Sequence, residues 1–243
     1  IEVKVSAIDV LSEAKTSPIP LETDGREIDE EMRLTYRYLD LRRARMQKNL
    51  LLRHKVTTLV REFLNGRGFV EIETPLLTKT SPEGARDFLV PSRKYPGTFF
   101  ALPQSPQQYK QLLMLAGFER YYQIARCLRD EDLRGDRQYE HTQIDMEMSF
   151  VTEEEVRQVA EEMIIAVVEG CGKKILAGPF PVFTHEEAMA KFGADKFDLR
   201  PEPKDPDTLA VEWVVDFPLL PTWGVTTSRR SISIAGRFFR GIR

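Results

Sequence analysis

The sequence contains few of the residues that disulfide frameworks and zinc sites require. Its 243 residues include two cysteines, Cys127 and Cys171, and three widely spaced histidines. Two cysteines cannot form a disulfide framework and are too few for a cysteine-based zinc site. We therefore predict no metal site in this chain, structural roles for both cysteines, and a reducing compartment, the cytoplasm, as its location.

Long apolar runs are missing as well. No stretch approaches the roughly 18–20 apolar residues that cross a bilayer, and residues 1–5 contain no apolar core of a secretory signal. We expect no membrane partner. The chain opens without methionine and inside an alternating pattern, which predicts that it was cut from something longer.

Two nucleotide-binding signatures are also absent, since the sequence holds neither a P-loop nor a GxGxxG run. A net charge of −3 gives no argument for a nucleic-acid partner, which only local sites could indicate. The charge is uneven, because residues 224–243 carry five arginines and no acid. Residues 1–223 then hold 30 basic and 38 acidic side chains, a net charge of −8.

What is present is a series of short strands and amphipathic helices. Alternation at 1–10 predicts a strand, and the polar stretch at 11–35 predicts a linker. Further strands are expected at 69–75, 99–102, 121–129, 142–150 and 212–217, and helices at 43–65, 105–116, from Thr152 onward and at 185–192. Capping boxes at Thr152 and Thr184 support the last two helices. Strands paired through loops and backed by helices predict an α+β fold with an antiparallel sheet.

The chemistry concentrates in residues 126–150. On the strand at 142–150, Gln143, Asp145, Glu147 and Ser149 share one face, and the apolar residues share the other. If this strand pairs with 121–129, Arg129 lies beside Gln143 and Asp145. A guanidinium near a carboxylate and an amide predicts a small-ligand site. The alternative is a charged hairpin on a solvated face, where such pairs contribute little.

Several runs resemble the class II aminoacyl-tRNA synthetases. Residues 68–75, GFVEIETP, are similar to motif 1 of that family, and residues 129–150 are similar to motif 2. The runs YRYLDLRR at 36–43, SPEGARD at 81–87 and LPQSPQQYKQLLM at 102–114 resemble the bacterial aspartyl branch. The likeness extends from residue 1 to about 200 and resumes at 213–218.

The resemblance implies a class II synthetase-like antiparallel β-sheet flanked by helices, incomplete at the C-terminus. It also implies a reaction in which L-aspartate attacks the α-phosphate of ATP and the aspartyl group then passes to the 3′ end of tRNA. The implied partners are ATP, L-aspartate, tRNA(Asp) and a second copy of the chain, bound through motif 1. Whether tRNA(Asn) is also a substrate stays open, because much of that choice lies in an anticodon domain.

The resemblance also implies roles for single residues. Arg129 matches the motif 2 arginine on the α-phosphate, where its planar fork donates two parallel hydrogen bonds, and it is the expected catalytic residue. The expected aspartate-binding residues are Glu83 on a mobile loop, Gln107, Lys110 on the substrate's side-chain carboxylate, Arg129 and Asp145. The expected ATP-binding residues are Arg129, Glu131, Gln138 and His141. Pro75 is expected at the dimer interface.

One of these residues departs from the family pattern. His141 stands where the aspartyl enzymes usually place a phenylalanine that stacks on adenine. Because a histidine ring is polar and titrates, we predict a weaker or pH-sensitive ATP site.

Larger departures concern whole segments. The inserted bacterial domain is replaced by a short linker at 201–206, and neither motif 3 nor the acids that hold Mg²⁺ are found, so the Mg²⁺ ligands are expected in a missing segment. We therefore divide the chain into a remnant of an anticodon-binding β-barrel at 1–10, a linker at 11–35, a catalytic domain at 36–223 and a basic tail of unknown structure at 224–243.

Three hypotheses follow from the resemblance and its gaps. The first is a truncated catalytic domain that activates aspartate and charges tRNA. The second is a non-catalytic paralog or fragment that binds tRNA or a partner. The third is a paralog that adenylates aspartate without tRNA.

Overall fold

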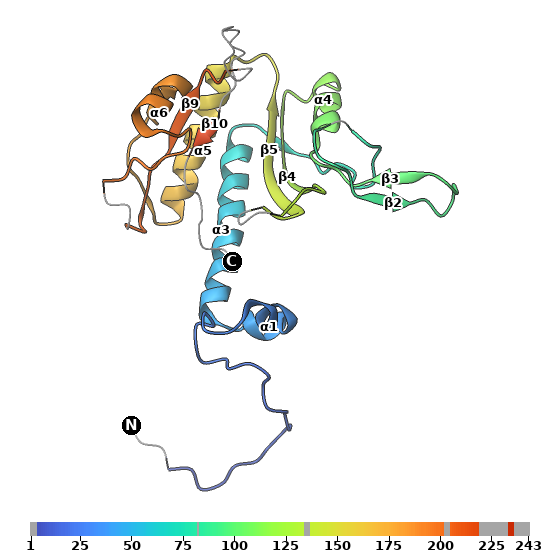
Figure 1. The fold of residues 1–243 in the computed structure, drawn as a ribbon, viewed down its shortest axis with the longest axis vertical. Helices are drawn as coiled ribbons and strands as arrows, with labels where there is room; N and C mark the ends of the chain where they lie inside the picture. Colours follow the sequence, from blue (N-terminus) through green and yellow to red (C-terminus); the bar gives the residue numbers. More distant parts are fainter. Residues whose placement is uncertain (1–3, 82, 134–136, 202–204, 219–232, 236–243) are drawn as a thin grey trace. The chain divides into compact units, whose positions relative to one another are not determined.

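A computed structural model describes residues 4–81, 83–133, 137–201, 205–218 and 233–235 (Figure 1). The chain divides into two compact units, residues 1–54 and 55–243, and the boundary lies within helix α3 (Ala44–Gly66). Among the helices that these ranges contain, none is long and apolar enough to cross a membrane.

The first unit differs from its sequence-based prediction. Residues 4–10 have no regular structure, so the predicted strand is absent from them, and residues 1–3 lie outside the described part. No strand is described elsewhere in this unit to take up their backbone hydrogen bonds. The stretch predicted as a linker contains α1 (Glu30–Thr35), followed by α2 (Arg37–Asp40). Asp29 begins α1 by accepting a hydrogen bond from the Glu31 N–H at 2.9 Å.

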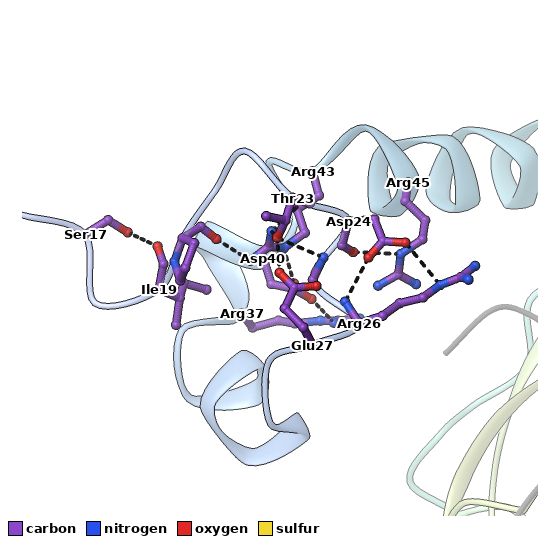
Figure 2. A network of polar contacts seen from close by, with 12 residues as sticks. Ser17, Ile19, Thr23, Asp24, Arg26, Glu27, Arg37, Asp40, Arg43 and Arg45 are labelled. Atoms are coloured by element: carbon purple, nitrogen blue, oxygen red, sulfur yellow. Dashed lines mark hydrogen bonds and ion pairs between the residues drawn. The ribbon is translucent and has the colours of Figure 1, made fainter.

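A buried ion pair organises this unit (Figure 2). Arg43 Nε donates to Asp40 Oδ1 at 2.8 Å, and both side chains are almost fully buried. The rest of the guanidinium donates to the backbone oxygens of Pro20 at 2.5 Å and Thr23 at 2.7 Å. Gly25 has a φ of +79°, and a Cβ there would lie 2.6 Å from Arg43 Nε. The polar stretch is therefore folded around Arg43, which its composition did not indicate.

The second unit is built on a sheet with strand order β1-β4-β5. Its strands are β1 (Val70–Glu71), β4 (Arg120–Leu128) and β5 (Glu140–Met148). Strands β4 and β5 pair antiparallel, with Gln123 opposite Asp145 and Cys127 opposite His141. Strand β1 pairs parallel with β4 and is shorter than the strand predicted at 69–75.

The two faces of this sheet differ in character. On one face, Tyr122 and Met146 pack against Val60 and Leu64 of α3 and Met163 of α5 (Glu153–Gly170). The other face meets α4 (Gln107–Leu115), and Figure 1 shows the β4–β5 hairpin between α4 and α5. The predicted separation of apolar and polar faces is confirmed within β5, because alternate side chains of a strand point in opposite directions. It was wrong at Phe150, which was assigned to the apolar face but lies beyond the end of β5 and is 95% exposed.

The remaining elements form smaller sheets. Strand β9 (Glu212–Val215) lies between β7 (Val182–Thr184) and β10 (Ser233–Ala235), and α6 (His185–Phe192) follows β7. The other pairs are β2 (Leu89–Pro91) with β3 (Phe99–Ala101), antiparallel, and β6 (Lys174–Ile175) with β8 (Thr208–Leu209), parallel. Strand β10 belongs to the stretch predicted as a basic tail, most of which lies outside the described residues.

The α+β prediction is confirmed, as are the capping boxes that begin α5 and α6. The pairing is more mixed than expected, because β1–β4, β7–β9 and β6–β8 are parallel. Helix α4 begins at Gln107 rather than at Ser105. The Ser105 hydroxyl accepts from the Gln107 N–H at 3.3 Å and also donates to Glu83.

Candidate functional site

A mostly buried lysine joins α4 to β5. Lys110 Nζ lies 3.3 Å from Asp145 Oδ1 and 3.1 Å from Glu147 Oε2, and the lysine side chain is 12% exposed. Asp145 and Glu147 reach it together because they are two residues apart on one strand and therefore share a face. The sequence predicted a cation beside a carboxylate on this face. The structure contains such a pair, but the cation is Lys110 rather than Arg129.

Asp145 has a raised pKa, and one of its carboxylate oxygens lacks a well-directed hydrogen bond from the described residues. Burial raises its pKa above the ordinary value, while the ammonium of Lys110 acts in the opposite direction. Gln143 Nε2 donates to Asp145 Oδ2 at 2.9 Å. Oδ1 is buried and accepts no well-directed hydrogen bond from any described residue, although Lys110 is close. A buried acceptor in this state can take a hydrogen bond from a ligand's ammonium group.

Glu83 lies on the loop that precedes β2. Its carboxylate accepts hydrogen bonds from the Ser81 hydroxyl at 3.0 Å and from the Ser105 hydroxyl at 2.5 Å. Gly84 follows with a φ of +96°, a conformation that suits glycine because a side chain would be strained there. A small pocket beside Glu83 is lined by Thr78, Lys79, Ser81, Glu83, Pro103, Ser105, Gln108 and Tyr109.

Arg129 lies just beyond the end of β4, where its N–H donates to the oxygen of Tyr139 at 2.7 Å. The prediction that Arg129 lies beside Gln143 and Asp145 was wrong. In the register of the two strands, Gln143 is opposite Ala125 and Asp145 is opposite Gln123, farther along the hairpin. The Arg129 Nε is buried and has no hydrogen-bond partner among the described residues. A buried guanidinium nitrogen in this state can donate to an anionic ligand.

The pKa of the Cys127 thiol responds to the charges of several predicted site residues. Burial raises its pKa, the charge of Arg129 lowers it, and the charges of Asp145 and Glu83 raise it. The charges of three predicted site residues, from three segments of the chain, therefore act on one buried side chain. The thiol also donates to Gln143 Oε1 at 3.7 Å.

His141 lies opposite Cys127, near the arginine. Burial lowers its pKa, Arg129 lowers it further, and Glu131 acts in the opposite direction. The imidazole is therefore held in its neutral form, which suits packing against an aromatic base.

The other predicted residues are less enclosed. Glu131 and Gln138 are exposed in the hairpin loop, and Pro75 is exposed after β1. Gln107 is half-buried in the first turn of α4, one turn before Lys110. The structure links Glu131 to this group only through its charge on His141.

Sequence reasoning assigned no role to two residues that contact the site, Glu147 and Ser105. Glu147 pairs with Lys110, and its alternation with Asp145 was the available signal. Gln143, predicted as the amide of a small-ligand site, donates to Asp145. Ser105 had been assigned only to the start of a helix, and nothing local indicated its bond to Glu83, which lies 22 residues earlier.

Among the residues that the structure describes, no group of three or more His, Cys, Asp or Glu side chains is arranged to hold a metal ion. Class II synthetases in general use ATP and Mg²⁺, but this part of the chain does not supply a magnesium cluster.

Comparison with known proteins identifies the family. Residues 29–235 match the model of the class II tRNA synthetases (D, K and N). The chain belongs to this family. The matched range of this synthetase chain ends within the stretch predicted as a basic tail.

The chain has close relatives among curated proteins. It is 58% identical over 200 residues to the aspartate–tRNA(Asp/Asn) ligase of Syntrophomonas wolfei, covering 82% of this chain and 34% of that protein. It is 51% identical over 217 residues to the aspartate–tRNA ligase of Staphylococcus haemolyticus, covering 89% of this chain and 37% of that one. The synthetase chain thus spans about a third of the length of these relatives.

A solved structure agrees in fold. The crystal structure of asparaginyl-tRNA synthetase from Pyrococcus horikoshii, complexed with asparaginyl-adenylate, superposes with a TM-score of 0.70 at 20% identity. The match covers 86% of this chain and 53% of that one. At this identity, the comparison supports the fold alone.

Proposed function

We propose that this chain is the amino-acid-activating domain of an aspartate–tRNA ligase. It would bind L-aspartate and ATP, form aspartyl-adenylate and release pyrophosphate. It would then transfer the aspartyl group to the 3′ end of tRNA(Asp). The observation that carries the proposal is the buried Lys110–Asp145 pair, whose carboxylate has one oxygen without a well-directed hydrogen bond from the described residues.

The Lys110–Asp145 pair can recognise both charged ends of aspartate. Lys110 offers its ammonium to the side-chain carboxylate of the substrate, and Asp145 Oδ1 accepts from the α-ammonium. Asparagine would be bound less well, because a neutral amide does not satisfy the lysine's charge. Glu83 and Gln107 are proposed to complete the aspartate site from the loop and from the first turn of α4.

The residues around Arg129 can bind ATP. Arg129 would donate to the α-phosphate, while neutral His141 would pack against adenine, and Glu131 and Gln138 would contact ATP from the hairpin loop. An oxygen of the substrate α-carboxylate then attacks the α-phosphorus, and the bond to the leaving pyrophosphate breaks. Arg129 would stabilise the negative charge that builds up on the phosphate. Holding both substrates on one sheet face supplies most of the orientation that this step needs.

Transfer to tRNA forms the second half of the proposal. A ribose hydroxyl at the 3′ end attacks the carbonyl carbon of the adenylate, and AMP leaves. One of the relatives is named an aspartate–tRNA(Asp/Asn) ligase and the other an aspartate–tRNA ligase, so tRNA(Asn) is a second substrate to test. The Mg²⁺ requirement, the dimer through Pro75 and the cytoplasmic location stay predictions.

Calorimetric titration with L-aspartate tests the binding site directly. We expect the 243-residue chain to bind aspartate more tightly than asparagine, and we expect Lys110→Met to lose about a hundredfold in affinity for aspartate, as a missing charged partner would predict. Lys48→Met, on an exposed lysine, is the matched control. Equal affinity for aspartate in Lys110→Met and in the unchanged chain would contradict the assignment.

Charging assays then separate the hypotheses. A ligase charges tRNA(Asp), whereas a paralog acting without tRNA forms adenylate and charges none. A chain that binds tRNA but neither aspartate nor ATP would be the non-catalytic alternative.

A further inference from the structure

A buried glutamine pairs with the loop that carries Glu83. The side chain of Gln104 is 1% exposed. Its Oε1 accepts a hydrogen bond from the Ala85 N–H at 3.0 Å, and its Nε2 donates to the Ala85 oxygen at 2.9 Å. One carboxamide thus satisfies both polar groups of one backbone residue, as a neighbouring strand would.

The same amide reaches both sides of Glu83. Nε2 also donates to Asp87 Oδ1 at 2.5 Å and lies 3.5 Å from the oxygen of Ser81. The other carboxylate oxygen of Asp87 accepts from the Thr80 hydroxyl. Gln104 therefore contacts residues that precede and follow Glu83 in the sequence, although it makes no hydrogen bond to Glu83 itself.

Backbone hydrogen bonds also connect the segment of Gln104 to the segment that carries Arg129. The Leu128 N–H donates to the oxygen of Pro103 at 2.9 Å, and the Asp130 N–H donates to the oxygen of Arg86 at 3.0 Å. Residues 85–86, 103–104 and 128–130 consequently form a closed circuit of hydrogen bonds. The carboxamide of Gln104 is the side-chain link in that circuit, and Arg129 lies between its two attachment points on the third segment.

We propose that Gln104 is a positioning residue that holds Glu83 and Arg129 in one frame. The inference rests on the proposed function, in which these two residues meet aspartate and the α-phosphate. Gln104 would set the spacing of the two substrates without touching either. An apolar side chain of similar volume would fill the space but would leave the Ala85 backbone without its partners, so the loop would rearrange.

Hydrogen exchange of single amides tests the frame without any assay of activity. In Gln104→Met, we expect the Ala85 amide to exchange at least about tenfold faster than in the unchanged 243-residue chain, because its acceptor is gone. The Asp130 amide should also exchange faster, although Gln104 makes no bond to it. Gln111→Met, on an exposed glutamine of α4, is the matched control and should change neither amide. Unchanged exchange at Asp130 would overturn the shared frame.

Turnover supplies the second measurement. In aspartate-dependent exchange of pyrophosphate into ATP, Gln104→Met should lower kcat/KM for aspartate by about 10-fold to 100-fold, since small displacements are costly in oriented reactions. Gln104→Glu keeps the acceptor for Ala85 but sets a carboxylate against Asp87. Its kcat/KM, relative to the unchanged chain, should therefore recover from pH 8 to pH 6, where protonation restores a donor.

The outcomes separate the two claims. Full turnover in Gln104→Met, or a pH profile of Gln104→Glu that parallels the unchanged chain, would contradict the positioning role. If the unchanged chain shows no aspartate-dependent exchange, the proposed function fails, and the Asp130 amide still decides whether Gln104 holds the frame.

Discussion

At the scale of single residues, the site holds a carboxylate in a buried position, where its ionised form is less stable than in water. Asp145 is almost fully buried, and its raised pKa means that the folded chain disfavours the ionised form relative to water. Such a group does not add to stability when it is ionised, and the proposed function gives it a role in binding aspartate. Its neighbours Lys110 and Gln143 limit the cost without satisfying every lone pair.

The residue scale gives a prediction about Asp145. The folded carboxyl binds its proton more tightly than the unfolded chain does. The free energy of unfolding should therefore fall as pH rises from the ordinary Asp pKa to the raised one. In Asp145→Asn this fall should disappear, and stability at neutral pH should rise while aspartate affinity is lost. Urea denaturation between pH 4 and pH 7 checks it, and lower stability of the variant at pH 7 would contradict it.

A second prediction concerns His141. Because burial and Arg129 lower its pKa, the ring stays neutral to a lower pH than an ordinary histidine does. Protonation would replace the neutral ring that packs against adenine by a hydrated cation, so the KM for ATP should rise as the pH falls through the lowered pKa. His141→Phe should lower that KM severalfold and remove its pH dependence. An equal pH profile in the two proteins would refute the role given to the ring.

At the scale of elements, α5 holds the apolar face of the central hairpin. Met163 and Val167 pack against Tyr122, and the helix begins with a capping box in which Thr152 accepts from the Glu155 N–H at 3.3 Å. Replacing the hydroxyl by Thr152→Ala should lower the free energy of unfolding by about 1 kcal/mol. Thr152→Ser keeps the hydroxyl and should lose far less, so equal losses in thermal denaturation would disprove the capping contribution.

The elements also show what the sequence can and cannot predict. Capping boxes and alternation are local, so they predicted α5, α6 and the polar face of Gln143, Asp145 and Glu147. The register of β4 and β5 depends on side-chain packing against α4 and α5, which a linear pattern does not contain. The expectation that Arg129 lies beside Asp145 failed for that reason. Parallel pairs such as β7 with β9 join distant segments and carry no local signal.

At the scale of the whole molecule, the chain forms two compact units with different supports. The second has an apolar core, whereas the described part of the first depends on Arg43, which joins Asp40 to the backbone around Thr23. Composition suggested only a linker there, because the contacts of Arg43 reach more than twenty residues back along the chain.

Arg43→Met should therefore unfold the first unit selectively. Removing one partner of a buried pair leaves Asp40 poorly compensated and should cost about 3 kcal/mol. Hydrogen exchange should show lost protection at residues 17–43 and retained protection in β4 and β5. Arg26→Met removes an arginine whose side chain is 77% exposed and serves as control. Loss of protection across the hairpin as well would show that the two units do not unfold separately.

The central claim is that one face of the β4–β5 hairpin activates aspartate with ATP. Aspartate-dependent exchange of labelled pyrophosphate into ATP measures that step alone, and Arg129→Ala is the decisive variant. Arg126→Ala is the matched control, because Arg126 is exposed, lies on β4 three residues before Arg129 and pairs with Glu140. We predict exchange in the unchanged chain and in Arg126→Ala, and a loss of about a thousandfold in Arg129→Ala. No exchange from the folded chain, or full exchange in Arg129→Ala, would contradict the account.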